Sequence, residues 1–282
     1  MDIMGINFIK MHGLGNDFII IDAINKNFLL DSNLVHKISD RRKGIGCDQV
    51  LLIRNSDIAD AEMVVFNSDG SKSEACGNGA RCVAKYLANR ETKSEISLLS
   101  EDRVLDCYIK NQNLVSICMG LPEFRWDKIP ILNPIDPLNL DLSFEDKYEN
   151  VISNPIALSV GNPHIVFFVD DPYKIDLEHL GPIIENHSLF PQKVNVNLAT
   201  ILSKSSLSLR VWERGAGITL ACGTGACAIA SVLHHSKQIK PNQSIRINQE
   251  GGEDLFVTIN KTGSMILRGP AAKQFSGELP PI

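Results

Sequence analysis

The segment Ala75-Cys76-Gly77-Asn78-Gly79-Ala80 recurs as Ala221-Cys222-Gly223-Thr224-Gly225-Ala226, 146 residues further along the chain. The same offset aligns other positions without a gap, among them Gly15-Asn16 with Gly161-Asn162, Gln49 with Asn195, Val65-Phe66 with Val211-Trp212, and Asn67 with Glu213. A single register that holds from residue 15 to residue 84 is hard to obtain by chance. Because internal self-similarity of this kind marks a repeated structural unit, the sequence predicts two copies of one fold.

The 282 residues are enough for two domains, at roughly 100–200 residues each. Four prolines crowd together after Gly120-Leu121, at positions 122, 130, 134 and 137, which is typical of a linker and loops. We therefore expect an N-terminal half over residues 1–122 plus 269–282 and a C-terminal half over residues 123–268. The segment Gly269-Pro270-Ala271 would mark the return of the chain to the first half.

Short runs rich in β-branched and aromatic residues predict strands at Phe18–Asp22, Val50–Ile53, Glu62–Phe66, Ile165–Val169 and Ser208–Trp212. Each Ala-Cys-Gly-x-Gly segment follows such a strand and opens an apolar pattern with helical spacing. The second pattern, Ala226 to Leu233, is apolar on nearly all sides, as in a helix enclosed by its own sheet. The expected fold class is α/β (α+β), with two pseudo-symmetric domains that each wrap a strand-rich layer around a central helix.

Charge and composition exclude several classes of function. The net charge is −5 and the isoelectric point is about 5.8, whereas nucleic-acid and anionic-membrane binders carry a basic surface. Apolar runs such as Ile165–Val169 are far shorter than the roughly 20 residues of a membrane span. The first residues show no basic region followed by an apolar one. We therefore expect a cytoplasmic protein without a nucleic-acid or membrane partner.

The seven cysteines favour reduced thiols, because their number is odd and no export signal is visible. No Cys-x-x-Cys pair occurs, and no His/Cys group has zinc-ligand spacing, so we expect no metal site. For most of these cysteines the simple interpretation is a small buried apolar side chain. Cys76 and Cys222 are the exceptions, because each stands at the mouth of a predicted helix.

The first N–H groups of a helix are unpaired donors, and the aligned peptide dipoles add partial positive charge there. Such a terminus binds a carboxylate or phosphate and favours the thiolate form of a neighbouring cysteine. A tight glycine turn beside an inert cysteine would explain one copy of the motif. Two copies instead predict a pair of acidic thiols that work together.

Two equivalent thiols fit a reaction that needs a base on one face of a carbon and an acid on the other. Inversion of a stereocentre has this requirement: one thiolate removes a proton and the opposite thiol delivers one. The helix N–H groups would stabilise the carboxylate beside the developing carbanion. The scheme needs no cofactor, and the sequence contains neither a Walker A loop nor a Gly-x-Gly-x-x-Gly segment after a strand.

Seven motifs give the chain a close resemblance to the diaminopimelate epimerase family over nearly its whole length. They are Lys10–Phe18, Asp40-Arg41 with Gly44–Gln49, Phe66–Gly70, Glu74–Cys82, Gly161–His164, Val194-Asn195, and Trp212–Gly217 with Ala221–Ala226. The resemblance implies a cofactor-independent epimerase that interconverts LL- and meso-diaminopimelate by a two-cysteine mechanism, in lysine and peptidoglycan precursor biosynthesis. It also implies a small-molecule substrate and a homodimer.

The resemblance assigns roles residue by residue. It places Cys76, Cys222, His164 and Glu213 among the catalytic groups. It assigns substrate binding to Asn16, Gln49, Asn67, Gly77, Asn78, Asn162, Asn195, Glu213, Arg214, Gly223 and Thr224. These residue types suit a substrate with two amino-acid heads, because guanidinium binds carboxylate, carboxylate binds ammonium, and amides bind either.

Two departures and two alternatives stay open at this point. Ile218 stands where the family commonly has an acidic residue, and residues 129–149 are expected to form an elaborated surface loop. A proline or hydroxyproline racemase shares the cysteine pair, but its second cysteine usually follows Asp-Arg-Ser-Pro, where this chain has Ile218–Ala221. A non-catalytic thiol redox protein would leave the Asn, Gln and Arg set unexplained.

Overall fold

The computed structural model of the chain describes residues 5–26, 28, 30–73, 76–111 and 114–279. Its contacts divide the chain into two compact units. Unit 1 comprises Met1–Ile117 together with Gly269–Ile282, and unit 2 comprises Cys118–Arg268. The chain passes between the units within two strands, β7 (Leu114–Gly120) and β17 (Met265–Pro270), and its C-terminal strand therefore belongs to unit 1.

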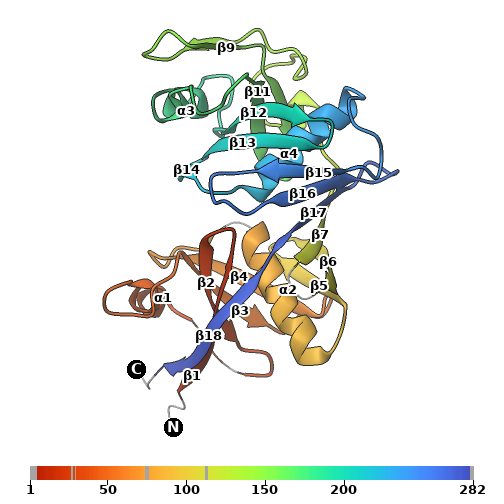
Figure 1. The fold of residues 1–282 in the computed structure, drawn as a ribbon. Coiled ribbons are helices and arrows are strands. Elements are labelled where there is room, and N and C mark those ends of the chain that lie inside the picture. Colours follow the sequence, from red (N-terminus) through yellow and green to blue (C-terminus); the bar gives the residue numbers. More distant parts are fainter. Residues whose placement is uncertain (1–4, 27, 29, 74–75, 112–113, 280–282) are drawn as a thin grey trace. The chain divides into compact units, whose positions relative to one another are not determined.

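Unit 1 is a mixed sheet that carries two helices (Figure 1). Its strands lie in the order β7-β6-β5-β4-β3-β2-β1-β18. In chain order the elements are β1 (Ile6–Gly13), β2 (Asn16–Asp22), α1 (Ser32–Ser39), β3 (Gln49–Arg54), β4 (Ala61–Asn67), α2 (Gly77–Glu91), β5 (Glu95–Ser100), β6 (Arg103–Asn111), β7 and β18 (Ala272–Leu279). The last strand, β18, pairs antiparallel with the first, β1.

The central strands of unit 1 are covered on both faces. Ile19 and Val50 share a core with Val35 of α1. Leu51 points to the opposite face, because successive side chains of a strand alternate, and its methyl groups lie against Gly79 of α2. Burial on both faces explains the continuous apolar runs Phe18–Ile21 of β2 and Val50–Ile53 of β3.

Unit 2 repeats this arrangement. Its strands lie in the order β10-β11-β12-β13-β15-β16-β17, β14 pairs with β13, and β8 and β9 form a separate hairpin. In chain order the elements are a short 3₁₀ helix η1 (Trp126–Lys128), β8 (Ser143–Glu145), β9 (Val151–Ser153), β10 (Ile156–Ser159), β11 (Pro163–Phe168), α3 (Leu177–Glu185), β12 (Asn195–Ser203), β13 (Ser206–Glu213), β14 (Gly217–Thr219), α4 (Gly223–His235), β15 (Ser244–Asn248), β16 (Leu255–Ile259) and β17.

Strand register confirms the internal duplication. In unit 1 the parallel strands β2 and β3 pair Phe18 with Gln49. In unit 2 the parallel strands β11 and β12 pair His164 with Asn195. Both residues of the second pair lie 146 positions after those of the first. Residues that are 146 positions apart in the sequence therefore occupy equivalent places in the two sheets.

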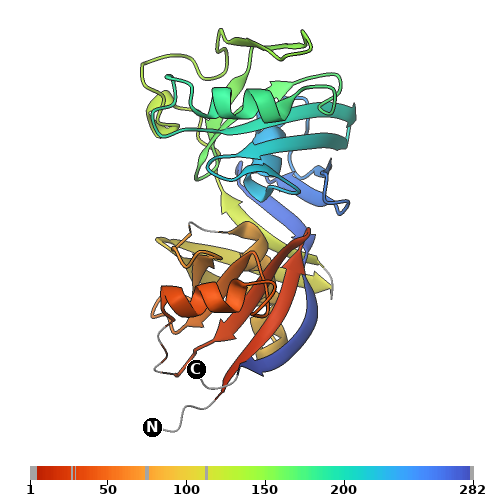
Figure 2. The same ribbon diagram turned by 90° about the vertical axis from the view of Figure 1, so that its left-hand side faces the viewer.

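A strand layer around a central helix is confirmed in each unit. Helix α2 contacts β1, β2, β3, β5 and β6, and α4 contacts β10, β11, β12, β13 and β16. Residues 225–233 of α4 are all buried, as its apolar sequence requires. Each unit adds an outer helix, α1 or α3, on the other face of its sheet (Figure 2). Within the described residues, none of these helices is long and apolar enough to cross a bilayer.

The segment 129–149 is mostly exposed and irregular, as expected for a surface loop, but it is also anchored in the core of unit 2. Ile129, Ile131 and Leu140 are buried in the core of unit 2. They pack in the same cluster as Leu180 and Ile184 of α3. Three apolar side chains thus anchor the irregular stretch that leads into the β8–β9 hairpin.

Candidate active site

The two repeated cysteines cap the two central helices in the same way. Cys76 and Cys222 are the N-cap residues of α2 and α4, both with extended backbone. The N–H of Gly79 donates to Sγ of Cys76 at 3.4 Å, and the N–H of Gly225 donates to Sγ of Cys222 at 3.4 Å. Each sulfur therefore takes the place that a Ser or Asp oxygen usually fills at a helix start.

One edge of the unit 1 sheet gathers the predicted polar residues. Strand β2 begins at Asn16 and the parallel strand β3 begins at Gln49, while the antiparallel β4 ends at Asn67. All three residues therefore lie at the same edge. Sγ of Cys76 donates to Oδ1 of Asn16 at 3.9 Å, so the start of α2 meets this edge.

The remaining polar groups of unit 1 hold one another in place. Gln49 Nε2 donates to Asn67 Oδ1 at 3.1 Å across the β3–β4 pair. Asn78, in the first turn of α2 after Gly77, accepts from Nη2 of the buried Arg81 at 2.6 Å. Glu74 and Ala75, which belong to the same sequence motif, lie outside the described residues. The structure thus brings the five predicted unit 1 side chains to one place.

Unit 2 gathers its own set at the equivalent edge. Asn162 immediately precedes β11, Asn195 begins β12, and Glu213 ends β13. Thr224, in the first turn of α4 after Gly223, lies 3.5 Å from Asn162 Nδ2 through its Oγ1 and 3.4 Å from Sγ of Cys222. The carboxyl of Glu213 lies close enough to the Cys222 thiol for each group to shift the pKa of the other. This edge therefore combines a thiol, a carboxyl, an amide and a hydroxyl.

The prediction that both thiols are unusually acidic is wrong for Cys222. Burial raises the pKa of this thiol well above its ordinary value, and the neighbouring Glu213 charge raises it further. The bonds from Thr224 and from the Gly225 N–H act in the opposite direction but are outweighed. Cys222 is 4% exposed, whereas Cys76 is only partly buried, so the two thiols differ in environment despite their common cap geometry.

Glu213 is tuned by two opposing effects. Burial raises the pKa of this carboxyl, because the charged form loses solvation, while the hydrogen bond from Thr219 lowers it. Thr219 Oγ1 donates to Glu213 Oε1 at 2.5 Å. A carboxylate with a raised pKa beside a thiol is a suitable acceptor for the proton of that thiol.

His164 lies next to this group and is fully buried. Its Nδ1 is 3.1 Å from Nδ2 of Asn197, and its Nε2 is 2.9 Å from Oδ1 of Asn162. Burial lowers the pKa of His164 to about 3. The imidazole is therefore neutral, and it contacts Asn162 rather than a sulfur.

Asn195 and Arg214 are joined through the backbone. Asn195 Oδ1 accepts from the N–H of Arg214 at 3.0 Å, and its Nδ2 donates to the carbonyl of Pro163 at 2.8 Å. The guanidinium of Arg214 donates through Nη1 to the carbonyl of Gln192 at 3.0 Å. Asn195 therefore fixes the segment that carries Arg214 to the start of β11.

Four further residues support the site and were not found from the sequence. Asn197 orients His164, Thr219 bonds Glu213, Gln249 Oε1 accepts from the N–H of Cys222 at 2.7 Å, and Arg81 holds Asn78. The sequence does contain a signal for Asn197. The repeat offset aligns this polar residue with the apolar Leu51, although the positions on either side of it match. Ile218, the departure from the family pattern, packs against the unit 2 core. Among the described residues, no three His, Cys, Asp or Glu side chains gather as metal ligands would.

Comparison with known proteins points to one family. A sequence profile of diaminopimelate epimerase matches residues 8–125 and 156–273, one segment in each half. A diaminopimelate epimerase from Pelagibacter ubique is 43% identical over 269 residues, which cover 95% of this chain and 97% of that protein. A diaminopimelate epimerase from Acidiphilium cryptum is 42% identical over 272 residues, with 96% and 95% coverage.

Solved structures share the fold at much lower identity. A hydroxyproline epimerase from Agrobacterium vitis, crystallised with trans-4-hydroxy-L-proline, aligns with a TM-score of 0.65. The alignment covers 98% of this chain and 91% of that one, at 15% identity. This likeness concerns the fold alone, whereas the relatives above match in sequence over nearly the full chain.

Proposed function

The chain belongs to the diaminopimelate epimerase family, and we propose that it interconverts LL-2,6-diaminopimelate and meso-2,6-diaminopimelate by inverting one α-carbon. The observation that carries the proposal is the repeated cysteine cap. Sγ of Cys76 and Sγ of Cys222 each accept a helix N–H at 3.4 Å, at equivalent places in the two halves. A redox protein would not need the amide beside Cys76 or the carboxyl and hydroxyl beside Cys222.

In the proposed reaction one sulfur, as thiolate, takes the α-proton, so that the C–H bond breaks and an S–H bond forms. The other sulfur, as thiol, gives its proton to the opposite face of the same carbon. The two cysteines exchange roles with the handedness of the substrate. The first N–H groups of α2 at Gly77-Asn78 and of α4 at Gly223-Thr224 would bind the carboxylate next to the carbanion, where negative charge develops.

Glu213 completes the unit 2 half of this scheme. Cys222 has a raised pKa and therefore rests as the thiol, ready to donate. To act as a base it must first lose its proton, and the neighbouring Glu213 carboxylate is the group in place to take it. His164 contributes by holding Asn162 and remains neutral throughout.

The other residues would bind the two amino-acid heads of the substrate. Arg214 suits the distal carboxylate, because a guanidinium binds it through two parallel hydrogen bonds. Glu213 suits an ammonium group, and the amides can serve either charge. The amides proposed to contact substrate are Asn16, Gln49, Asn67, Asn78, Asn162 and Asn195.

The family resemblance supports four further proposals. The reaction would serve lysine and peptidoglycan precursor biosynthesis, the enzyme would be cytoplasmic, it would be a homodimer, and no cofactor would take part. The epimerase halves would be residues 1–122 with 269–282 and residues 123–268.

Isotope incorporation tests the mechanism. In deuterium oxide, early product formed from LL-diaminopimelate should carry deuterium at the inverted carbon, while unreacted substrate stays protiated. This follows because the donating thiol has exchanged with solvent, whereas the abstracted proton leaves on the other sulfur. Cys76→Ala and Cys222→Ala should each abolish inversion, and any slow α-hydrogen exchange that remains should favour opposite isomers in the two variants.

Mass spectrometry after chiral chromatography provides the measurement, with L-proline and trans-4-hydroxy-L-proline as alternative substrates. Mainly protiated early product, or an alanine variant that retains the parent rate, would exclude the two-thiol mechanism. Conversion of proline without conversion of diaminopimelate would exclude the proposed substrate.

A further inference from the structure

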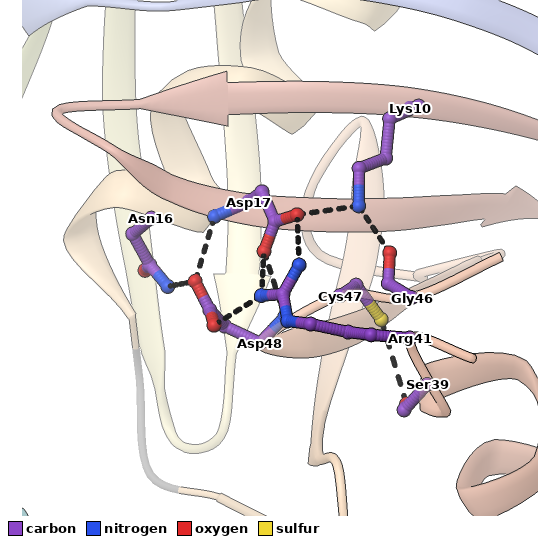
Figure 3. Close-up of polar contacts among 8 residues, drawn as sticks. All are labelled: Lys10, Asn16, Asp17, Ser39, Arg41, Gly46, Cys47 and Asp48. Carbon is purple, nitrogen blue, oxygen red and sulfur yellow. Dashed lines mark hydrogen bonds and ion pairs between the residues drawn. The ribbon is translucent and has the colours of Figure 1, made fainter.

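A charged cluster behind Cys76 has no equivalent in unit 2. Lys10, Asp17, Arg41 and Asp48 form it, and Figure 3 shows their contacts. Arg41 donates Nη1 and Nη2 to the two oxygens of Asp17 at 3.0 and 2.8 Å, and Nη2 also donates to Asp48 Oδ1 at 2.7 Å. Lys10 Nζ donates to Asp17 Oδ2 at 2.6 Å and to the carbonyl of Gly46.

The cluster is held from several directions. Burial alone would raise the pKa of Asp17, but its hydrogen bonds with Arg41 and Lys10 keep the pKa well below the usual range. The N–H of Asp48 donates to Asp17 Oδ1 at 2.9 Å, so the two carboxylates are joined through the backbone as well as through Arg41. Asp48 is therefore fixed on one side by a fully ionised pair.

On its other side Asp48 faces Asn16. Asp48 Oδ2 accepts from Asn16 Nδ2 and from the N–H of Asp17, each at 3.0 Å (Figure 3). A carboxylate only accepts, so it selects the NH₂ end of the Asn16 amide. The oxygen end of the amide is then left toward Cys76, whose Sγ donates to Asn16 Oδ1 at 3.9 Å.

The equivalent amide in unit 2 has the opposite orientation. Asn162 turns its oxygen to His164 Nε2 at 2.9 Å and its NH₂ toward Thr224 Oγ1, which in turn contacts Cys222. The repeat offset places Val194 where unit 1 has Asp48. Each half therefore fixes one asparagine amide through a different hydrogen-bond partner. In unit 1 the amide oxygen faces the cysteine, whereas in unit 2 the NH₂ group faces the threonine that contacts the cysteine.

We propose that Asp48, held by Arg41, is a positioning residue that fixes the Asn16 amide with its oxygen toward the Cys76 thiol. The proposal rests on the proposed role of Cys76 as an acid/base group. An oxygen there accepts from the thiol, as an acid about to donate requires, whereas an NH₂ group would favour the thiolate. Asp48 thereby biases Cys76 toward the protonated form through Asn16.

The rate of Cys76 alkylation as a function of pH tests this without any catalytic turnover. Trypsin releases Cys76 as the only cysteine of the peptide Ser73–Arg81, so iodoacetamide labelling between pH 6 and pH 10 can be followed by mass spectrometry. Cys82, which interacts electrostatically with Cys76, stays neutral over most of this range, because burial raises its pKa to about 12. The buried Cys47, in the peptide Gly44–Arg54, reports on folding by staying unlabelled.

Asp48→Ala frees the amide to turn its NH₂ to the sulfur. The pH of half-maximal labelling should fall by about half a unit to one unit, because a donor then stabilises the thiolate. Asp48→Asn is the matched control: it removes the charge and the one bond from Arg41 Nη2 to Asp48 Oδ1. Its single oxygen can keep the Asn16 and Asp17 donors, while Arg41 keeps its two bonds to Asp17. This variant should label like the parent.

A double-mutant cycle separates positioning from charge. In an Asn16→Ala background, Asp48→Ala should no longer shift the Cys76 profile, because the residue through which Asp48 acts is missing. Equal shifts for Asp48→Asn and Asp48→Ala, or a shift that persists without Asn16, would overturn the proposal. If Cys47 becomes reactive in the Asp48→Ala variant, Asp48→Val is used instead, because unit 2 has valine at the equivalent position. The same fall in the pH of half-maximal labelling is expected. Failure of the protein to epimerise diaminopimelate would count against the proposed function and leave these labelling outcomes intact.

Discussion

Nε2 of His164 lies 2.9 Å from Oδ1 of Asn162. The Asn197 Nδ2 group faces the other ring nitrogen, Nδ1, at 3.1 Å. Because an NH₂ group donates, Nδ1 must be the acceptor, and the single proton of the neutral ring is on Nε2. His164 therefore donates to Asn162 and turns the NH₂ of that amide toward Thr224. This histidine orients a neighbour, and it does so only while it is uncharged.

The neutral His164 should make unit 2 sensitive to mild acid. Its pKa is lowered from 6.5 to about 3 by burial, then by the charge of Arg214. Below pH 6.5 the unfolded chain binds a proton that the folded state does not, so stability falls with pH from 6.5 toward 3. Between pH 6.5 and pH 5 the loss should be about 2 kcal/mol.

Urea unfolding measures this effect through tryptophan fluorescence, because Trp126 and Trp212 both lie in unit 2. His164→Phe, the residue type of the equivalent position 18, should be less stable at pH 7.5 but should lack this part of the pH dependence. If His164→Phe does not fold, His164→Gln is used for the same comparison. Glu213, with its raised pKa, acts in the opposite direction and is common to all the variants, so the difference between parent and variant is decisive. Equal slopes would contradict a buried neutral histidine.

Thr219 should set the acidic limb of the activity profile. Its hydroxyl lowers the pKa of Glu213 against the effect of burial. Thr219→Val removes that bond, so the Glu213 carboxyl should ionise only at a higher pH. The acidic limb of the kcat/KM profile should therefore shift by about half a pH unit to one pH unit toward higher pH. Thr219→Ser keeps the hydroxyl and should behave like the parent. An acidic limb that is identical in all three proteins would mean that Glu213 need not be ionised.

Arg214 should determine recognition of the distal carboxylate. Loss of a buried charged contact costs on the order of 2–5 kcal/mol, so Arg214→Met should lower kcat/KM for diaminopimelate by about 30-fold to several thousand-fold. Arg214→Lys should recover only part of this, because an ammonium lacks the planar fork of a guanidinium. Labelling of Cys76 and Cys222 by iodoacetamide should be unchanged in both variants. Near-parent activity of Arg214→Met would remove this residue from substrate binding.

The repeat made most of the fold predictable. One offset, read from the two cysteine segments, located equivalent strands, and the Phe18–Gln49 and His164–Asn195 pairs show that the offset holds in the hydrogen-bond register. The outer helices α1 and α3 were not predicted, because neither follows a repeated motif. The anchoring of residues 129–149 was missed because isolated apolar residues among prolines carry no periodic pattern.

The parts of the site that escaped prediction are those in which the halves differ. The repeat compares residue types, so it pointed to Cys76 and Cys222 as equals, whereas burial and the Glu213 charge distinguish them. Burial depends on long-range packing that no local motif encodes. Where unit 1 has Phe18 and Leu51, unit 2 has His164 and Asn197, a coordinated change from an apolar pair to a hydrogen-bonded one. A mismatch flanked by matched positions is the signal that marks such specialised residues.

The same difference predicts unequal tolerance at two equivalent glycines. A Cβ on Gly79 would lie 3.1 Å from a methyl group of Leu51, which can turn aside. A Cβ on Gly225 would lie 2.6 Å from Asn197 Oδ1. Asn197 cannot turn aside freely, because its Nδ2 contacts His164 Nδ1 and donates to the carbonyl of Ile165 at 3.0 Å.

Both Gly→Ala changes gain the same helix propensity, so the difference between them isolates the packing term. Gly225→Ala should be less stable than Gly79→Ala by about 1–3 kcal/mol, the usual cost of overpacking. Hydrogen exchange of α2 and α4 peptides gives the measurement in each unit: protection of α4 should fall in Gly225→Ala, and protection of α2 should change little in Gly79→Ala. Displacement of Asn197 should also release His164 and lower epimerase activity in Gly225→Ala. If the two variants lose protection equally, the Asn197–His164 pair is not the rigid support that its geometry indicates.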